Sequence, residues 1–253
     1  MTQLEVCCGD LLSLHEAKKG GAERIELCTA LAEGGLTPSI GLIREAVKAG
    51  FEEINVLIRP RGGDFLYSDE EIHLMDKDIK EAIMNGATGI VIGALTSEGY
   101  IDKETMYFLI SKAREYGDAK GRHINLTFHR AFDLCKNPQE SLEDLVSLNC
   151  DCLLTSGMSP DAYTGIPEIK KLMKQADGRI RIMAGSGINE DNISEIVMTT
   201  GVPLIHSTAK KKVKSKMKFR REDVAMGSKM TDEYSYNQTS ASIVAKLLEK
   251  LNS

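Results

Sequence analysis

The sequence has no tryptophan, only 5% aromatic residues and no long hydrophobic run. Its longest apolar runs, such as residues 89–95, are far shorter than the ~20 residues that a membrane-spanning helix needs. Residues 1–10 lack the basic and apolar stretches of a secretory signal, so we expect no export. The formal net charge of −5 argues against general nucleic-acid affinity. We therefore expect neither a membrane nor a nucleic acid as a partner.

The cysteines also lack the spacings of common metal and redox motifs. Neither C-x-x-C nor H-x-x-x-H occurs in the chain. An even number of cysteines in a small secreted chain would predict disulfides, but a chain of 253 residues without an export signal favours free thiols. We therefore expect a cytoplasmic protein with reduced cysteines. The six cysteines are Cys7, Cys8, Cys28, Cys135, Cys150 and Cys152.

What the sequence does contain is a regular alternation of short strand-like runs and longer helix-like segments. Eight runs, mostly rich in Val, Ile and Leu, are typical of buried strands: 4–8, 24–28, 53–59, 89–94, 125–130, 152–157, 181–186 and 204–208. Segments with apolar residues at helical spacing follow them: 11–19, 40–48, 69–85, 103–115, 138–148, 162–175, 190–198 and 239–251. Eight such units predict a single-domain α/β protein with the TIM (β/α)8 barrel fold. A doubly wound open sheet is the alternative, but no G-x-G-x-x-G follows the first strand.

One long segment, 209–238, interrupts this alternation between the eighth strand and the last helix. Connections of this length are often lids or interfaces, and a surface excursion without a role is the alternative. Residues 210–221 contain eight Lys or Arg in twelve positions. Because the rest of the chain is acidic and Phe219 is the only aromatic residue in the cluster, we favour a solvated loop over a nucleic-acid or membrane site.

The barrel prediction turns the search for a site toward the carboxyl ends of the strands. Side chains two apart in a strand face the same way. A charged Glu is costly in the apolar layer under the helices, so Glu5 and Glu26 should point into the barrel. Cys7 and Cys28 should then face inward one layer higher, whereas Cys8 faces the helices. The same alternation places further residues inside the barrel: Asn55, Leu57, Arg59, Thr127, His129, His206 and Thr208.

This predicted interior is unusually polar, and buried charges must be paired. We expect Arg59 to pair with Glu5 or Glu26. The set has two interpretations: an ion-pair network that holds the barrel, or an enzyme site in which His129 and Glu26 are candidate catalytic residues.

Two loops at the same end have features of an anion site. The RPRGGD segment, 59–64, carries Arg59, Arg61 and Asp64, and guanidinium groups bind carboxylates and phosphates. A loop salt bridge between Arg61 and Asp64 is the alternative. Loops after strands seven and eight often bind phosphate in barrels. The predicted residues there are Gly185, Ser186, Gly187 and His206.

The two inward cysteines have both a chemical and a structural interpretation. Cys7 and Cys28 end neighbouring strands, which lie about 4.8 Å apart in a sheet. Thiolates opposed across one ion lie roughly 4.5 Å apart, and such low-coordinate sulfur sites suit Cu(I). Ordinary small apolar packing is the alternative.

Several longer motifs resemble those of the CutC family, which is named for copper homeostasis. They are EVC (5–7), GAERIELC (21–28), EGGLTPS (33–39), IRPRGGDF (58–65), TFHRAFD (127–133), LTSG (154–157), MKFR (217–220) and VAMG (224–227). The resemblance covers nearly the whole chain. It implies a cytoplasmic TIM barrel associated with copper tolerance, forming a homo-oligomer (a dimer or tetramer), with Cys7 and Cys28 as the proposed Cu(I) ligands.

Three functions remain open from the sequence. The first is a copper homeostasis protein that binds Cu(I), its only expected cofactor. The second is a barrel enzyme that acts on a small phosphorylated or carboxylated metabolite. The third is a partner-binding barrel whose segment 209–238 forms an oligomer interface.

Overall fold

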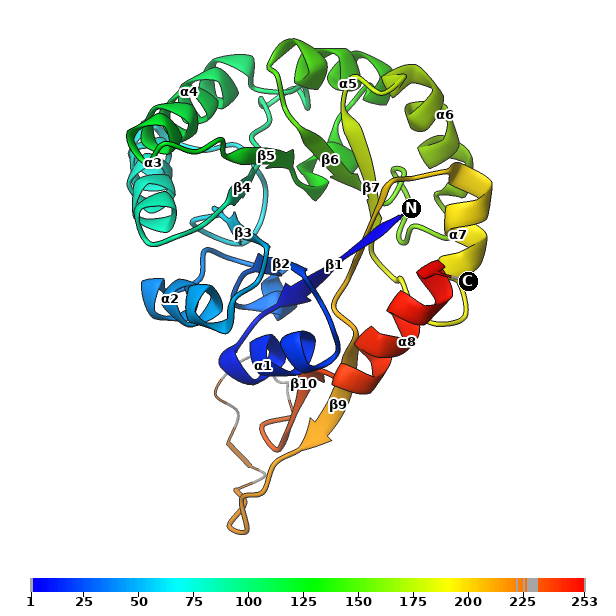
Figure 1. Ribbon diagram of the computed structural model, residues 1–253. Coiled ribbons are helices and arrows are strands. Elements are labelled where there is room, and N and C mark those ends of the chain that lie inside the picture. The colour runs from blue at the N-terminus through cyan, green and yellow to red at the C-terminus, as the bar shows by residue number, and fades with distance from the viewer. Residues whose placement is uncertain (1, 222, 225, 227–231, 253) are drawn as a thin grey trace.

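The computed structural model, which describes residues 2–221, 223–224, 226 and 232–252, contains a closed barrel of eight parallel strands (Figure 1). The strands are β1 Gln3–Cys8, β2 Arg24–Leu27, β3 Glu53–Leu57, β4 Gly89–Ile92, β5 Asn125–Phe128, β6 Cys152–Thr155, β7 Arg181–Gly185 and β8 Leu204–Ser207. They follow one another around the barrel in chain order, and β1 pairs with β8 to close it. This arrangement confirms the predicted TIM barrel.

Eight helices surround the strands in the described part of the chain (Figure 1). They are α1 Leu11–Lys19, α2 Ile40–Ala49, α3 Asp69–Met84, α4 Lys103–Ala119, α5 Pro138–Ser147, α6 Ile166–Ala176, α7 Ile193–Thr200 and α8 Ala241–Asn252. Short polar side chains begin most of them. Ser68 forms a capping box with Glu71 at α3, and Asp10 accepts a hydrogen bond from the Ser13 N–H at α1. None of these helices has the length and apolar character needed to cross a membrane.

The hydrophobic core has two parts. Most buried apolar residues, such as Ile25, Ile90 and Phe128, fill the layer between strands and helices. Inside the barrel there is only a small apolar group at each level, one of them consisting of Cys7, Cys28, Leu57 and Val91. Cys8 belongs to the outer layer. The strand alternation therefore places the two thiols inside the barrel as predicted, and Cys8 outside it.

The sequence suggested that the segment 209–238 is irregular, but parts of it form regular structure. Its ends form an antiparallel ribbon of β9 Lys210–Lys214 and β10 Ser235–Thr239, which projects from the barrel (Figure 1). The Thr239 N–H donates to Ser13 Oγ, and the Thr239 hydroxyl donates to the Thr208 carbonyl, so the base of the ribbon is fixed to the barrel. The segment that includes VAMG at 224–227 lies partly outside the described residues.

Two helices begin later than the sequence predicted. The helix expected from residue 162 is α6, which begins at Ile166. It begins late because residues around Gly165 form a turn against the end of β6. The helix expected from residue 190 begins at Ile193, because Asn189 and Asn192 bond to each other and to the Gly187 carbonyl instead. Asn side chains stabilise such turns in competition with a helix.

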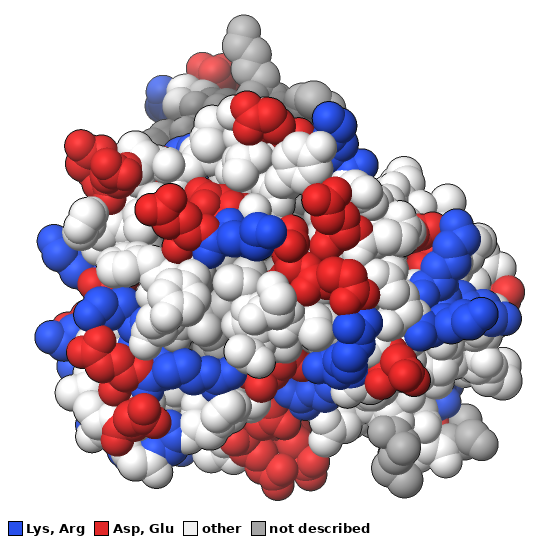
Figure 2. Space-filling model, turned by 90° about the horizontal axis from the view of Figure 1, so that it is seen from above, with Lys and Arg blue, Asp and Glu red and all other residues white. Residues whose placement is uncertain are grey.

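Acidic and basic side chains are interspersed on the face seen from above (Figure 2). Many of the surface charges pair along a single helix, such as Lys171 with Glu168 on α6 and Lys112 with Glu115 on α4. Charges of both signs lie close together over most of that face, and acidic side chains gather at its lower edge in this view (Figure 2).

Candidate functional site

A cavity of about 850 Å³ opens at the carboxyl ends of the strands. It brings together most of the residues that the sequence singled out: Cys7, Glu26, Cys28, Arg59, His129, Ser186, Gly187 and His206. Arg61, Asp64 and Gly185 do not line it. The convergence of β1, β2, β5 and β8 on one mouth is therefore as predicted, but part of the expected anion site lies elsewhere.

The two inward thiols lie at the base of this cavity. Cys7 Sγ and Cys28 Sγ are 3.5 Å apart, and both side chains are buried. The hydrogen bond between them, together with burial and the nearby Glu26, raises the pKa of Cys7 well above its usual range. Cys7 therefore holds its proton at neutral pH until something displaces it.

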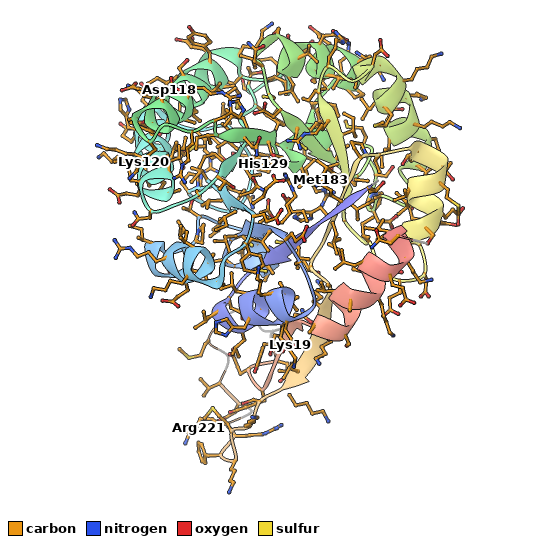
Figure 3. All side chains as sticks on the ribbon, viewed as in Figure 1. Lys19, Asp118, Lys120, His129, Met183 and Arg221 are labelled. Atoms are coloured by element: carbon orange, nitrogen blue, oxygen red, sulfur yellow. The ribbon has the colours of Figure 1, made fainter. Side chains whose placement is uncertain are left out.

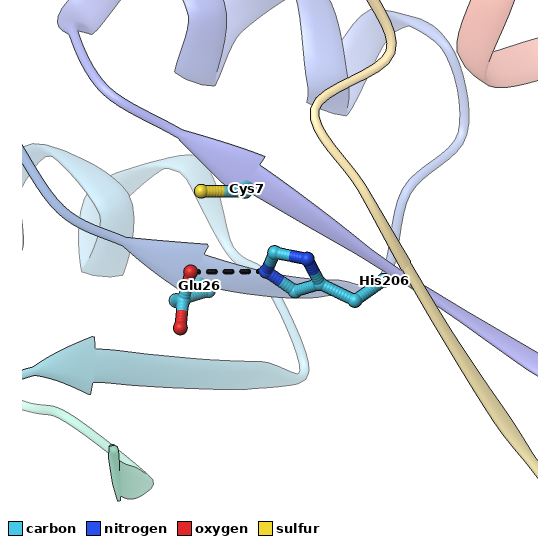
Figure 4. A group of neighbouring side chains, drawn as sticks. All are labelled: Cys7, Glu26 and His206. Atoms are coloured by element: carbon cyan, nitrogen blue, oxygen red, sulfur yellow. Dashed lines mark hydrogen bonds and ion pairs between the residues drawn. The ribbon is translucent and has the colours of Figure 1, made fainter. Parts of the chain in front are cut away.

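The sulfur separation favours a bent site over a linear one. Sulfurs bonded at ~2.3 Å to a shared ion subtend an angle of about 100° when they are 3.5 Å apart. Such an angle leaves room for a third ligand. Cys7 Sγ, a Glu26 oxygen and a His206 nitrogen all lie within 4.8 Å of one another (Figure 4). Thiols and an imidazole are soft donors that suit Cu(I), and Cys7 lies close both to Cys28 and to His206.

Glu26 and His206 form an ion pair beside the thiols. His206 Nε2 lies 3.0 Å from Glu26 Oε2 (Figure 4). Burial lowers the pKa of His206, but the Glu26 carboxylate outweighs burial and the net shift is upward. Burial likewise raises the pKa of Glu26, but His206 outweighs it and the net shift is downward. The pairing therefore favours the imidazolium form of His206 and the carboxylate form of Glu26.

The predicted pairing of Arg59 with Glu5 or Glu26 is wrong. Glu5 accepts hydrogen bonds from Arg24 Nε at 2.7 Å and from Asn55 Nδ2 at 2.8 Å. Arg24 lies opposite Glu5 in the β1–β2 register, and it also pairs with Glu53. The signal was present in the sequence, because the alternation that turns Glu26 inward also turns Arg24 inward.

Arg59 instead connects three loop carbonyls. Its Nη1 donates to the carbonyls of Glu33 and Gly35, and its Nη2 donates to that of Gly63. Its Nε has no hydrogen-bond partner, and within the described residues the guanidinium makes no ion pair. The side chain is only 6% exposed. Arg59 is therefore a buried cation compensated by carbonyl dipoles and by the Phe65 ring, 4.9 Å away.

His129 lies near the barrel axis at the end of β5 (Figure 3) and is only 5% exposed. Its Nδ1 accepts a hydrogen bond from the Ala131 N–H, so in the neutral ring the proton sits on Nε2. Nε2 has no partner among the described residues. Burial, with a further contribution from Arg59, lowers the pKa of His129 to about 4. The ring is therefore a neutral hydrogen-bond donor at physiological pH.

Arg61 and Asp64 form the loop salt bridge that was the alternative to an anion site. Arg61 Nη2 lies 3.0 Å from Asp64 Oδ1, and its Nε lies 2.6 Å from Glu71 Oε1. Arg61 is thus engaged at the start of α3, away from the cavity, and the two arginines of the RPRGGD segment do not act on one ligand.

The loop after β7 lines the cavity through its backbone. Ser186 has a φ of 82° and Gly187 a φ of 73°, both in the left-handed region. A Cβ on Gly187 would lie 2.8 Å from Asp161 Cβ, so the turn also requires glycine here because there is no space for a side chain. Gly185 is the last residue of β7, where an added Cβ would meet Leu154.

Sequence reasoning missed a second charged pair on the cavity wall. Arg130 Nε lies 2.8 Å from Asp133 Oδ2, and Arg130 Nη2 donates to Ser156 Oγ. Asp133 also accepts hydrogen bonds from the Ser156 and Met158 N–H groups. The Arg-x-x-Asp spacing within TFHRAFD was the available signal. The pair fixes the loop after β6.

Comparison with known proteins assigns this barrel to a family. The CutC family model matches residues 2–211. A CutC family protein of Vibrio campbellii is 43% identical over 251 residues, 99% of both chains. The human copper homeostasis protein cutC homolog is 43% identical over 96% of this chain and 87% of its own. The crystal structure of a CutC protein from Streptococcus agalactiae superposes with a TM-score of 0.75 at 35% identity, covering 82% of this chain and 99% of that one. The chain therefore belongs to the CutC family.

Proposed function

We propose that this chain is a cytoplasmic copper homeostasis protein that binds Cu(I) through Cys7 and Cys28. The observation that carries the proposal is the pair of buried sulfurs, 3.5 Å apart at the base of an open cavity. The human relative is named a copper homeostasis protein, which supports this proposal.

The surroundings of the thiols suit a bound soft cation. Cu(I) binds cysteine as the thiolate, so binding is coupled to proton release. The Glu26 carboxylate lies within reach of both Cys7 and His206. It offsets the positive charge of the ion and orients the imidazole, as carboxylates beside ligating histidines do. Harder divalent ions prefer oxygen donors and gain less from this set.

An anaerobic Cu(I) titration against a chromophoric chelator tests the proposal. The wild type should take up one equivalent per chain, and Cys7→Ser/Cys28→Ser should take up none at this site. His206→Gln should bind roughly tenfold more weakly, as expected for loss of one orienting or ligating group. The matched control is Cys135→Ser/Cys150→Ser, which changes two buried cysteines outside the cavity. Full uptake by the Cys7/Cys28 variant would eliminate the site.

A second function is favoured by a different observation, the size and lining of the cavity. About 850 Å³ is far more than one ion needs and is within the range of small-molecule sites. We infer an enzyme that acts on a small phosphorylated or carboxylated metabolite, in which Arg59 holds the anion and His129 and Glu26 are the catalytic residues. A thermal-shift screen of such metabolites, followed by product analysis of every hit, tests it. The absence of any hit that is converted would count against it.

A further inference from the structure

Two buried hydrogen-bond donors on the cavity wall have no acceptor in the described structure. They are Arg59 Nε–H and His129 Nε2–H, on side chains that are 6% and 5% exposed. Both side chains line the cavity. Native proteins pair most buried polar groups, so two unpaired donors on side chains that line one cavity indicate a ligand that supplies acceptors.

The two side chains pack against one aromatic ring, that of Phe65. The Arg59 guanidinium carbon lies 4.9 Å from the centroid of the Phe65 ring, and the His129 ring centroid lies 4.9 Å from the same centroid. Arg59 also acts electrostatically on His129. Arg59, which follows β3, and His129, which follows β5, therefore contact the same ring, although they are far apart in the sequence.

Gly93, at the end of β4, provides the space for this arrangement. A Cβ at this position would lie 2.5 Å from His129 Cε1 and 2.6 Å from His129 Nδ1. Its φ is not in the left-handed region, so the backbone itself does not require glycine. The missing side chain lets the imidazole lie over β4, on the Arg59 side of the mouth.

We propose that Arg59 and His129 form a subsite for the carboxylate of a small organic acid, with one donor for each carboxylate oxygen. This inference rests on the second function proposed above and does not depend on copper. A guanidinium N–H and a neutral imidazole N–H are complementary to a monoanion. Leu57 and Leu154, which also line the cavity, face the apolar part of the acid.

The charge of the surroundings favours a carboxylate over a phosphate. Arg59 supplies one full positive charge and His129 supplies none, because its ring is neutral. The Glu26 carboxylate is close enough to affect His129 electrostatically. A phosphate dianion next to that carboxylate would be repelled more strongly than a monoanion.

Calorimetric titration of the full, reduced, metal-free chain tests the subsite with benzoate, acetate and inorganic phosphate as probes. Benzoate should bind saturably with one site per chain, and phosphate should bind at least about tenfold more weakly. His129→Phe keeps the ring on Phe65 but removes the N–H, and Arg59→Lys keeps the charge but removes Nε–H. Each should weaken benzoate about tenfold, the expected loss for one charge-assisted hydrogen bond. Gly93→Ala should also weaken it by displacing the imidazole.

The matched controls are His73→Phe and Arg44→Lys, which change an exposed histidine and an exposed arginine on helices α3 and α2 and should leave benzoate binding unchanged. If His129→Phe does not fold, wild-type protein with ring-labelled histidine decides the matter, because benzoate must shift the His129 Nε2 resonance. Unchanged affinity in folded His129→Phe, equal affinity for phosphate, no saturable binding of benzoate, or no shift of that resonance would each overturn the proposal. Benzoate binding without turnover of any metabolite would leave the subsite standing and remove the enzymatic function.

Discussion

Burial lowers the pKa of both histidines in the mouth, but their charged neighbours give opposite net shifts. His129 has no carboxylate partner, so burial and Arg59 keep its ring neutral. His206 is also largely buried, but the adjacent Glu26 reverses the outcome. The pKa values of two histidines at one site are therefore shifted in opposite directions, that of His129 downward and that of His206 upward.

The low pKa of His129 predicts a specific loss of stability in acid. The folded-state pKa is about 4 and the unfolded value is 6.5, so between these values the unfolded chain takes up a proton that the folded chain refuses. Stability is therefore highest above pH 6.5 and falls as pH drops toward 4. Between pH 7 and 5 the wild type should lose about 2 kcal/mol more than His129→Gln, measured by urea unfolding. Equal losses in the two proteins would contradict the assignment.

How much of the site was visible in the sequence depends on the kind of interaction. Strand alternation correctly placed Cys7, Cys28 and Glu26 inside the barrel, because facing is a local property of a strand. Partners were harder to predict. Arg59 pairs with loop carbonyls, whose positions depend on the turns around Gly35 and Gly63. The 3.5 Å sulfur distance depends on barrel packing, which no single strand determines.

At the scale of elements, a buried ion pair connects the first strands of the barrel. Arg24 of β2 bonds Glu5 of β1, and Asn55 of β3 bonds the same carboxylate oxygen. Glu5 is fully buried, and burial raises its pKa. The cost of burying this carboxylate is offset only while both donors remain.

Removing one member of this pair should therefore destabilise the barrel strongly. We expect Arg24→Met to lower the free energy of unfolding by about 3–5 kcal/mol, because it leaves a buried carboxylate without its cation. The double variant Glu5→Gln/Arg24→Met should recover part of that loss, since no unpaired charge remains. Chemical denaturation of the three proteins at pH 7 measures both effects. A double variant less stable than Arg24→Met would show that the pair is not the cause.

The turn between β6 and α6 depends on one glycine for a different reason. A Cβ on Gly165 would lie 1.8 Å from the Ser156 carbonyl oxygen, although its φ of −81° is ordinary. Gly165→Ala should lower the free energy of unfolding by about 3 kcal/mol, because the added Cβ forces the backbone at residue 165 away from that of Ser156. Gly41→Ala is the control, because Gly41 lies in α2, where an added Cβ would make only an ordinary contact with Ser39 Oγ at 3.7 Å, and alanine there should stabilise the helix by up to about 1 kcal/mol. Urea midpoints that move equally would refute the steric explanation.

At the scale of the whole molecule, the β9–β10 ribbon carries apolar side chains into solvent. Phe219 is 70% exposed, Met217 60% and Met226 85%. Exposed apolar groups at the end of a projecting element are typical of interaction surfaces. We expect them to contribute to a homo-oligomer, a dimer or tetramer. Sedimentation velocity should show association in the wild type that is lost or weakened when residues 216–233 are replaced by a short turn. An unchanged oligomer would place the interface elsewhere.

The closure of the ring between β1 and β8 has a consequence during synthesis. Glu26 and His206 are 180 positions apart, and Cys7 belongs to the first strand made. Cys7 and Cys28 therefore emerge from the ribosome long before His206. Contacts of such long sequence separation form late, so in a nascent chain the proposed copper site would lack His206 beside it. Metal binding would therefore follow translation and would indicate that β8 has joined the barrel.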